Sequence, residues 1–556
     1  MAAVALTLVM WWGATPAPDT LVVCPESFAP AMRRWVRYRE GQGHRIEFLA
    51  NTLSGAEIRR AIRHSAKGNR LRFVVLVGDA EPPEKADGSA GLVCTPTHHA
   101  PAKVIARWGP EPTIATDNAY ADLDDDQVPD VAVGRLTADT AGELDRMLEK
   151  TLAYEQSPPP GEWRRRVSLV AGTGGFGLLV DSVIEAAARK FLTEDIPPGY
   201  VTSMTYGSWR SPFCPDPRRF REEALARLGE GCLFWVYMGH GEATALDDLR
   251  VPGAAYPVLA AGDLADLRRT GGAPIAVFLS CYAGALDAPR DCLAEELLRS
   301  PGGAVAVVGA SRVAMPYAMA VLGTELMQEY FQGGGETLGE VVLRAKRRMA
   351  ASREGSETGP LDNRRWLDSL AGALSPSPGS LPEERMEHVL MFNLLGDPLL
   401  RLRRPRAVRL HAGEEVEAGQ RLQVTGETEI AGQLTLELAC RRDRTTIRAP
   451  RRQSFPRSPA ELAAYSQVYA RANDGRWAAT AMLCGPGVFR AELRVPEQAE
   501  GPCFLRAFVD GGEECALGAA AVLVRRAGGS PQIASREAAA GESARRADGG
   551  GASGRR

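Results

Sequence analysis

The sequence predicts a mostly parallel α/β sheet covered by helices, followed by a β-sandwich of roughly immunoglobulin size. Up to about residue 402, short continuous apolar runs alternate with amphipathic helical stretches, which is typical of buried parallel strands between helices. Residues 405–525 contain short alternating runs such as QLTLELAC, which are typical of half-buried strands. Residues 526–556 contain almost no large apolar side chains and are expected to be disordered.

Length and composition describe an ordinary soluble globular protein. The chain has 556 residues, of which 45% are hydrophobic and 24% are charged. At roughly 150 residues per domain, three or four domains are expected. Lys and Arg total 66 against 69 Asp and Glu, a balance that gives no argument for binding nucleic acid or an anionic membrane. Ten cysteines without a C-x-x-C arrangement argue against a zinc ribbon or a thioredoxin-like site.

Residues 1–18 have the apolar core of a signal peptide. The run from Ala2 to Trp12 is too short to cross a bilayer, so no stable membrane span is expected. No Lys or Arg precedes this run, and the cleavage-like Thr15-Pro16-Ala17 is followed by Pro18. The sequence narrowly favours export to the periplasm or the cell exterior over a cytoplasmic protein with an irregular N-terminus.

A first α/β block is predicted over residues 19–156. TLVVC, HRIEFLA and RFVVLVGD are expected strands, with the helical FAPAMRRWVRYRE between the first two and a second helix capped by Ser54. The strand DVAVGRL and a helix around Leu144 to Tyr154 close the block. The proline-rich stretch from Ser157 to Gly161 then reads as a linker.

A second block is predicted over residues 162–404. Its expected strands are RVSLVAG, YVTSMTY, CLFWVYMGHG, PIAVFLSC and AVAVVGAS, with helices near 179–191 and 220–228. Residues 353–383 are rich in Ser, Gly, Pro and charge and predict a long loop. In the β module that follows, the only helical candidate is 460–470.

Two expected strands of the second block end in reactive residues. CLFWVYMGHG ends at His240-Gly241, and PIAVFLSC ends at Cys281. Ligands gather at the carboxyl ends of parallel strands, so neighbouring strands would present an imidazole and a thiol at one edge. The imidazole favours the thiolate or protonates a leaving amine, and the glycine lets a backbone N–H approach an oxyanion. Alone, either residue is more often structural; together they predict a nucleophilic site.

The order of these motifs resembles the caspase-like superfamily and, within it, the gingipain-type cysteine peptidases. TDNAYADLDDDQVPDVAVGRL at 116–136 resembles the family's segment before the catalytic half, and YMGHGEAT and FLSCYAGALD resemble its two catalytic segments. AVAVVGASRVAMPY and FNLLGDPLLRL match in character, so the resemblance covers about 20–402. It implies a caspase-like α/β fold in two sub-blocks and hydrolysis of protein or peptide substrates without a redox or organic cofactor.

The resemblance also implies roles for individual residues. Cys281 corresponds to the nucleophile and His240 to the general acid/base, and the backbone N–H groups of Gly241 and Cys281 form the oxyanion hole. Asp181 stands where an acidic residue orients the histidine. An acid interacting with a helix N-terminus is an equally good interpretation of Asp181. Glu242 follows the His-Gly pair where many members have a smaller residue, so it either alters substrate preference or is simply exposed.

Gingipains favour basic residues before the scissile bond by means of an acidic pocket group. Four acids lie near the motifs, and the sequence does not distinguish a pocket acid from surface charges among them: Asp247, Asp248, Asp287 and Asp291. The preferred substrate residue and the oligomeric state are not readable from the sequence.

An acidic turn offers a candidate metal site. Asp122, Asp124, Asp126 and Asp130 occupy positions 1, 3, 5 and 9 of a calcium-loop pattern that lacks its usual Gly and final Glu. Because gingipains bind calcium, a structural calcium ion is compatible with this stretch. A solvated acidic turn is the favoured interpretation.

Two rival functions remain open. The first is a gingipain-like scaffold kept for binding, in which Cys281 is inert. The second is a nucleotide-dependent enzyme that uses the G-x-G-x-x-G stretch from Gly172 to Gly177. The acid expected at the end of the next strand is missing from its place, which favours a tight strand-to-helix turn instead.

Four cysteines lie in the β module: Cys440, Cys484, Cys503 and Cys515. Export would allow them to form two disulfides with three connectivities, and without export they are small core residues. The sequence leaves both alternatives open.

Overall fold

The structure is a computed structural model. It describes residues 17–68, 70–80, 93–172, 195–265, 267–351, 363–375, 377–456 and 458–526. None of the helices in these ranges is long and apolar enough to span a bilayer. Most of the N-terminal stretch 1–18, and the tail beyond residue 526, lie outside the described residues.

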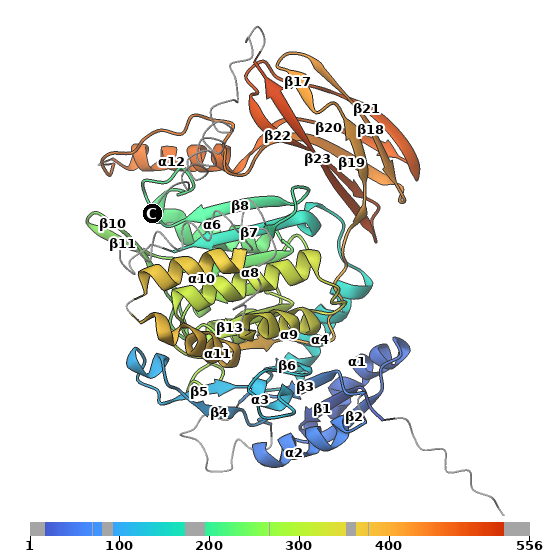
Figure 1. Ribbon diagram of the computed structural model, residues 1–556, viewed down its shortest axis with the longest axis vertical. Coiled ribbons are helices and arrows are strands. Elements are labelled where there is room, and N and C mark those ends of the chain that lie inside the picture. The colour runs from blue at the N-terminus through green and yellow to red at the C-terminus, as the bar shows by residue number, and fades with distance from the viewer. Residues whose placement is uncertain are drawn as a thin grey trace, which may run out of the picture.

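Both predicted α/β blocks contribute strands to one large sheet (Figure 1). The strands are β1 Thr20–Cys24, β2 Ile46–Ala50, β3 Phe73–Val77, β6 Ala132–Leu136, β7 Arg166–Ala171, β8 Val201–Tyr206, β9 Phe234–Met238, β12 Ile275–Leu279, β13 Ala306–Ala310 and β14 Phe392–Leu395. Their order is β2-β1-β3-β6-β14-β13-β12-β9-β7-β8. Among these described strands, only β13 and β14 pair antiparallel. The prediction of a mostly parallel sheet is therefore confirmed.

Helices cover both faces of this sheet. They are α1 Ala29–Gly41, α2 Gly55–Ala66, α3 Asn118–Ala121, α4 Ala141–Gln156, α6 Phe220–Gly229, α7 Leu293–Arg299, α8 Pro316–Gln332, α9 Leu338–Ala350, α10 Asn363–Leu374 and α11 Leu381–Met391. Residues of α8 to α11 share one buried cluster, and residues of α1, α4, α6 and α7 share another. Short 3-10 turns complete the connections at Glu26–Phe28, Ile105–Arg107, Glu162–Arg165, Pro217–Arg219, Ala261–Leu264 and Pro378–Ser380.

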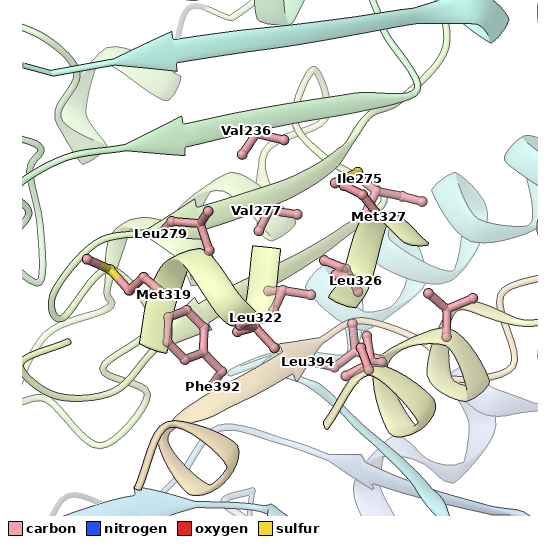
Figure 2. Packing of buried hydrophobic residues seen from close by; sticks show 14 of the residues in the cluster. Val236, Ile275, Val277, Leu279, Met319, Leu322, Leu326, Met327, Phe392 and Leu394 are labelled. Carbon is pink, nitrogen blue, oxygen red and sulfur yellow. The ribbon is translucent and has the colours of Figure 1, made fainter. Parts of the chain in front are cut away.

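The apolar strand β12 explains why both faces need a cover. Its five residues are all buried, and successive side chains of a strand point to opposite faces. Ile275, Val277 and Leu279 belong to the cluster with α8, whereas Ala276 and Phe278 belong to the cluster on the other face. Figure 2 shows Leu322, Leu326 and Met327 of α8 packed between β12 and Leu394 of β14. Helix α8 is thereby held firmly beneath the central strands.

Local signals explain several helix boundaries, and one expectation was wrong. The predicted Ser54 cap is confirmed, because its side chain and Glu57 form a reciprocal capping box at the start of α2. The predicted long loop over 353–383 instead contains α10 and the start of α11. Leu367 and Ala371 of α10 are buried in the main cluster. The Ser, Gly and Pro residues on either side obscured this short amphipathic pattern.

Two small hairpins lie outside the large sheet. They are formed by β4 His98–Pro101 with β5 Thr113–Thr116 and by β10 Asp248–Val251 with β11 Ala254–Pro257. The sequence did not predict either hairpin.

The C-terminal part consists of two sheets around a separate apolar core. Its strands are β15 Arg406–Ala407, β16 Arg409–Ala412, β17 Glu415–Glu417, β18 Arg421–Thr428, β19 Gly432–Cys440, β20 Arg476–Cys484, β21 Gly487–Arg494, β22 Gly501–Asp510 and β23 Cys515–Arg525. One sheet contains β16, β18 and β21, and the other contains the remaining six. Helix α12, Pro459–Asn473, is inserted between β19 and β20. Strand β18 alternates buried and exposed residues along its whole length, as expected for a sandwich.

Helix α12 covers the edge strand β8 of the large sheet (Figure 1). The Asn473 side chain accepts the Met204 N–H at 2.7 Å and donates to the Met204 carbonyl at 3.0 Å. These are the two bonds that a neighbouring strand would make. One turn earlier, Tyr469 hydrogen-bonds to Thr205 at 2.7 Å. The C-terminal module therefore satisfies backbone groups of the large sheet.

A buried ionic cluster joins the first helix to the end of the α/β part. Arg39 of α1 pairs with Glu155 at 2.8 Å and with Asp397 at 2.7 Å, and all three are buried. Asp397, in the FNLLGDPLLRL segment, also accepts the Trp35 indole N–H. Because buried charges need partners, each member of this cluster depends on the others.

Replacing Asp397 with Ala leaves Arg39 with a single carboxylate and Trp35 Nε1 without its acceptor. We expect the free energy of unfolding to fall by about 3 kcal/mol or more, measured by urea unfolding followed through tryptophan fluorescence. Glu514→Ala is the control, because Glu514 and its partner Arg406 are both about half exposed, and it should leave the unfolding curve unchanged. Equal curves for the two variants would contradict this account.

Replacing Asn473 with Ala removes both contacts to Met204 but leaves the helix sequence favourable. We expect the Met204 amide to exchange with solvent about fivefold faster, since a net hydrogen bond contributes about 1 kcal/mol. Hydrogen exchange with mass spectrometry over β8 measures this. Gln467→Ala removes an exposed amide from the same helix and should leave exchange unchanged; unchanged exchange in Asn473→Ala would refute the edge contact.

Candidate active site

The pairing of β9 with β12 determines where His240 and Cys281 lie. The two strands are parallel neighbours, with Phe234 opposite Ile275 and Met238 opposite Leu279. His240 and Cys281 each stand two residues beyond the last of these pairs, so they lie at the same edge of the sheet. Both side chains are half-buried. This edge is where ligands of parallel sheets are bound.

Gly241 lies against the cysteine segment. A Cβ atom on Gly241 would come within 2.8 Å of the Cys281 carbonyl oxygen and within 2.8 Å of Ser280 Oγ. Any larger residue would therefore force the two segments apart. The absence of a side chain lets the backbone of the His-Gly segment touch the backbone of the cysteine segment.

The backbone of His240 is held from two directions. Its carbonyl oxygen accepts the Tyr237 hydroxyl at 2.8 Å and the Asp247 N–H at 3.3 Å. Tyr237 is fully buried, and burial raises its pKa, so the phenol keeps its proton and donates it. Its hydroxyl also lies close to Gly172 and Gly239, because a Cβ atom on either glycine would come within 2.7 Å of it. The histidine is thus presented on a rigid backbone.

The Cys281 sulfur lies against the segment that precedes α8. The Ala314 N–H donates to Sγ at 3.3 Å, and the protonated thiol can donate to the Ala314 carbonyl oxygen at 3.7 Å. Burial raises the pKa of the Cys281 thiol above its ordinary value, while the N–H groups of Ala314 and of Cys281 itself act in the opposite direction. The resting sulfur is therefore a protonated thiol at neutral pH, beside N–H groups that favour its anion.

The chain turns sharply immediately after the cysteine. Tyr282 has φ of 57°, a left-handed conformation that costs energy for a residue with a side chain. Its N–H donates to the Arg312 carbonyl at 3.1 Å, and its hydroxyl donates to Glu111 at 2.8 Å. These bonds hold the strained turn that exposes one side of Cys281.

The four acids considered for a substrate pocket have different surroundings. Asp287 is buried and bonds Arg312 through both carboxylate oxygens and His99 at 3.0 Å. These partners hold the pKa of Asp287 well below its usual range, and they occupy its oxygens. Asp291 pairs with Arg299. Asp247 is half-buried and Asp248 is exposed, as is Glu242, which follows the His-Gly pair.

The hairpin of β4 and β5 forms a wall beside the cysteine. A Cβ on Gly109 would lie 3.1 Å from Val313 and 3.2 Å from the Tyr282 hydroxyl. The neighbouring Trp108 is 66% exposed. An aromatic side chain in solvent next to the two segments that flank Cys281 is available for contact with a bound molecule.

Helix α11 supports two segments beside Cys281: the β4–β5 connection and the segment that precedes α8. Glu387 accepts the backbone N–H groups of Lys103, Val104 and Ile105, in the connection between β4 and β5. One residue further along, His388 Nε2 accepts the Met315 N–H at 2.7 Å, next to the Ala314 group that contacts Cys281. Sequence reasoning missed these supports, because a lone Glu-His pair in a helix carries no motif.

Asp181 lies outside the described residues, as do Thr173 to Gly177 of the glycine-rich stretch. Of that stretch, Gly172 is described, and its N–H donates to the Met238 carbonyl at 2.9 Å. The roles of Asp181 and of the glycine loop remain predictions.

The acidic turn is only partly assembled into a metal-binding group. Carboxylate oxygens of three described residues lie within 4.8 Å of one another: Asp122, Asp124 and Asp130. The fourth residue, Asp126, is not in this group. Asp122 already accepts two backbone N–H groups and pairs with Arg59 at 3.0 Å, and Asp130 pairs with Arg347. This donor set fits an arginine-neutralised turn better than a calcium ion, and calcium binding stays a prediction.

A second acidic group, not predicted from sequence, consists of Asp79, Asp291 and Glu295. Burial and the neighbouring Asp79 raise the pKa of Glu295 well above its usual range. The guanidinium of Arg299 pairs with Asp291. A retained proton and an arginine therefore offset much of the negative charge.

All ten cysteines are described, and none of them forms a disulfide. Cys440 and Cys503 stand opposite each other on β19 and β22. Cys484 lies on β20 and Cys515 on β23. Outside the β module, Cys281 and Cys94 are half-buried and the other four are buried.

Known proteins resemble this chain in sequence and in fold. Lys-gingipain of Porphyromonas gingivalis is 22% identical over 306 residues, covering 52% of this chain and 15% of that protein. Gingipain R2 of the same species is 22% identical over 323 residues, covering 56% of this chain and 39% of that protein. The chain thus matches well under half the length of these relatives. The crystal structure of the Arg-specific cysteine proteinase gingipain R superposes with a TM-score of 0.50 at 14% identity, covering 92% of this chain and 99% of that one, which shows the fold.

The comparison with family models covers the whole α/β part. The model described as peptidase family C25 matches residues 14–403. That range contains the His-Gly segment, the cysteine segment and the helices α8 and α11. The chain belongs to peptidase family C25, the gingipain family of cysteine peptidases.

Proposed function

We propose that this chain is a cysteine endopeptidase with Cys281 as nucleophile and His240 as general acid/base. The observation that carries the proposal is the parallel pairing of β9 with β12, which brings the two side chains to one edge of the sheet. Membership of a cysteine peptidase family supports the same assignment. Protein or peptide chains are the proposed substrates.

The proposed reaction has two halves. The imidazole of His240 takes the thiol proton as Sγ attacks the substrate carbonyl carbon, forming a C–S bond and an oxyanion. The N–H groups of Gly241 and Cys281 are proposed to stabilise that oxyanion. The C–N bond then breaks, and the amine leaves with the proton held by His240. Water attacks the thioester in the second half, releasing a carboxylic acid and restoring the thiol. No redox or organic cofactor enters either half.

A binding scaffold with an inert Cys281 is the alternative. One observation favours it: burial raises the pKa of this thiol, so the sulfur needs the imidazole to become a nucleophile. The two candidates differ in whether an electrophilic peptide reacts at Cys281. Export of the protein remains a separate proposal, tested by sequencing the N-terminus of the protein recovered from its native host.

The mechanism predicts that one thiol out of ten reacts. An electrophilic peptide analogue should label Cys281 in the native protein, and Cys281→Ala should abolish both labelling and peptide hydrolysis. His240→Ala should slow hydrolysis by roughly a hundredfold or more, the usual scale for lost acid–base assistance. Mass-spectrometric mapping of the label and peptide turnover measure these effects.

Cys94 and Cys484 provide the matched controls, because both are half-buried like Cys281. Replacing either with Ala should change neither labelling nor turnover. Full turnover by Cys281→Ala, or a label on another cysteine, would disprove the proposed nucleophile. Binding of peptide without any reaction at Cys281 would favour the scaffold.

Adding a methyl group at Gly241 tests the close backbone approach. Gly241→Ala places a Cβ at 2.8 Å from the Cys281 carbonyl oxygen and displaces an N–H proposed for the oxyanion hole. We expect kcat to fall by about a hundredfold or more, the scale of one lost oxyanion donor, in steady-state assays. Gly262→Ala has nothing within 4 Å of its new methyl group and should keep the original kcat. An unchanged kcat in Gly241→Ala would remove this glycine from the mechanism.

A further inference from the structure

His388 is a fully buried histidine that contacts neither His240 nor Cys281 directly in any described bond. It lies in α11 with 0% exposure. Its Nε2 accepts the Met315 N–H at 2.7 Å, so Nδ1 carries the proton and donates to the Glu384 carbonyl at 2.7 Å. Burial lowers the pKa of His388 to about 4. The ring is therefore a neutral acceptor of fixed tautomer.

The N–H group that donates to His388 is adjacent in sequence to the N–H group that contacts the proposed nucleophile. Met315 N–H goes to His388, and the preceding Ala314 N–H goes to Cys281 Sγ at 3.3 Å. Two successive N–H groups of one short segment are thus directed to two different acceptors. Fixing one peptide plane restricts the next, because the two share the Cα atom of Ala314.

The rest of α11 and α8 makes this arrangement stiff. Met315 is the N-cap of α8, and one turn later the Ala318 N–H donates to Glu384 of α11 at 3.3 Å. The His388 ring stacks on Phe392 with 6.0 Å between centroids. Figure 2 shows Met319, at the start of α8, beside Leu279 at the end of β12. The sulfur therefore contacts the residue just before the N-cap of a 17-residue helix, and the N-terminal region of a helix favours negative charge.

A neutral acceptor suits this position. A carboxylate in place of the imidazole would also hold the Met315 N–H, but it would add a negative charge beside the sulfur and oppose the thiolate. The uncharged ring orients the segment without this cost.

We propose that His388 is a positioning residue for the nucleophile: by accepting the Met315 N–H, it keeps the neighbouring Ala314 N–H on the Cys281 sulfur and so stabilises the thiolate. This inference rests on the role proposed for Cys281 but is tested by thiol chemistry rather than by peptide cleavage.

The test compares the alkylation of Cys281 by iodoacetamide in the full chain, followed by mass spectrometry. The rate at pH 7.5 reports the thiolate fraction, and the plateau rate at high pH reports access to the sulfur. In His388→Leu the Met315 N–H has no acceptor, and we expect the pH 7.5 rate to fall about tenfold with the plateau little changed. In His388→Gln the amide oxygen can replace Nε2, and the rate should stay within about threefold of the original.

Two further variants separate positioning from loss of stability. Phe392→Leu disturbs the same core but leaves the imidazole acceptor, so its pH 7.5 rate should be unchanged. His388→Asn keeps a polar side chain that is too short to reach Met315, so its pH 7.5 rate should also fall about tenfold. This variant provides the test if His388→Leu does not fold. The proposal is overturned if His388→Leu or His388→Asn reacts at the original rate, if Phe392→Leu slows the reaction equally, or if both rates of a His388 variant fall by one factor.

Failure of the proposed peptidase function has a different signature. If Cys281 cleaves no peptide but its alkylation still depends on His388, the positioning role stands and the peptidase assignment fails. If peptides are cleaved at Cys281 while alkylation is indifferent to His388, the peptidase assignment stands and this inference fails.

Discussion

The parallel register between β9 and β12 is the constraint on which the candidate site depends. Because side chains alternate along a strand, a slip of one residue would turn every side chain of β12 to the opposite face. The burial of Ile275, Val277 and Leu279 on one face and of Ala276 and Phe278 on the other prevents such a slip. The same apolar pattern that fixes the sheet therefore also fixes where His240 and Cys281 emerge. The positions of His240 and Cys281 at the edge of the sheet therefore follow from the packing of the buried strand residues.

A second constraint acts from outside the sheet, through α11. Glu387 and His388 are consecutive residues, yet they accept N–H groups from segments 211 residues apart in the sequence: the β4–β5 connection at Val104 and the start of α8 at Met315. Backbone N–H groups in such turns need acceptors when they are buried. Because both acceptors belong to one helix, α11 fixes the position of the β4–β5 connection relative to the segment that precedes α8.

The sequence predicted the sheet, its helices and the two strand ends well, because each depends on local periodicity. It did not predict α10, whose short amphipathic pattern lies among Ser, Gly and Pro residues. Nor did it predict the contact of the Ala314 N–H with Cys281. Every residue except proline has a backbone N–H, so residue types do not reveal which of these groups lies near the sulfur. Asp287 illustrates the limit for charges: it was a candidate pocket acid until the fold placed Arg312 and His99 on its oxygens. Partners that are distant in the chain decide what a carboxylate can do.

The contact between Asn473 and Met204 has a consequence for how the protein behaves among other molecules. An uncovered edge strand is a template with which a strand of a second chain can pair, and long, flat, hydrophobic edge strands are especially prone to this form of aggregation. Here the Asn473 amide occupies the backbone hydrogen-bonding groups of Met204 in β8, and Tyr469 of the same helix bonds the Thr205 side chain. The C-terminal module thus occupies part of the β8 edge of the large sheet. The backbone groups of Met204 that these contacts occupy are therefore not available for pairing with a strand of another molecule.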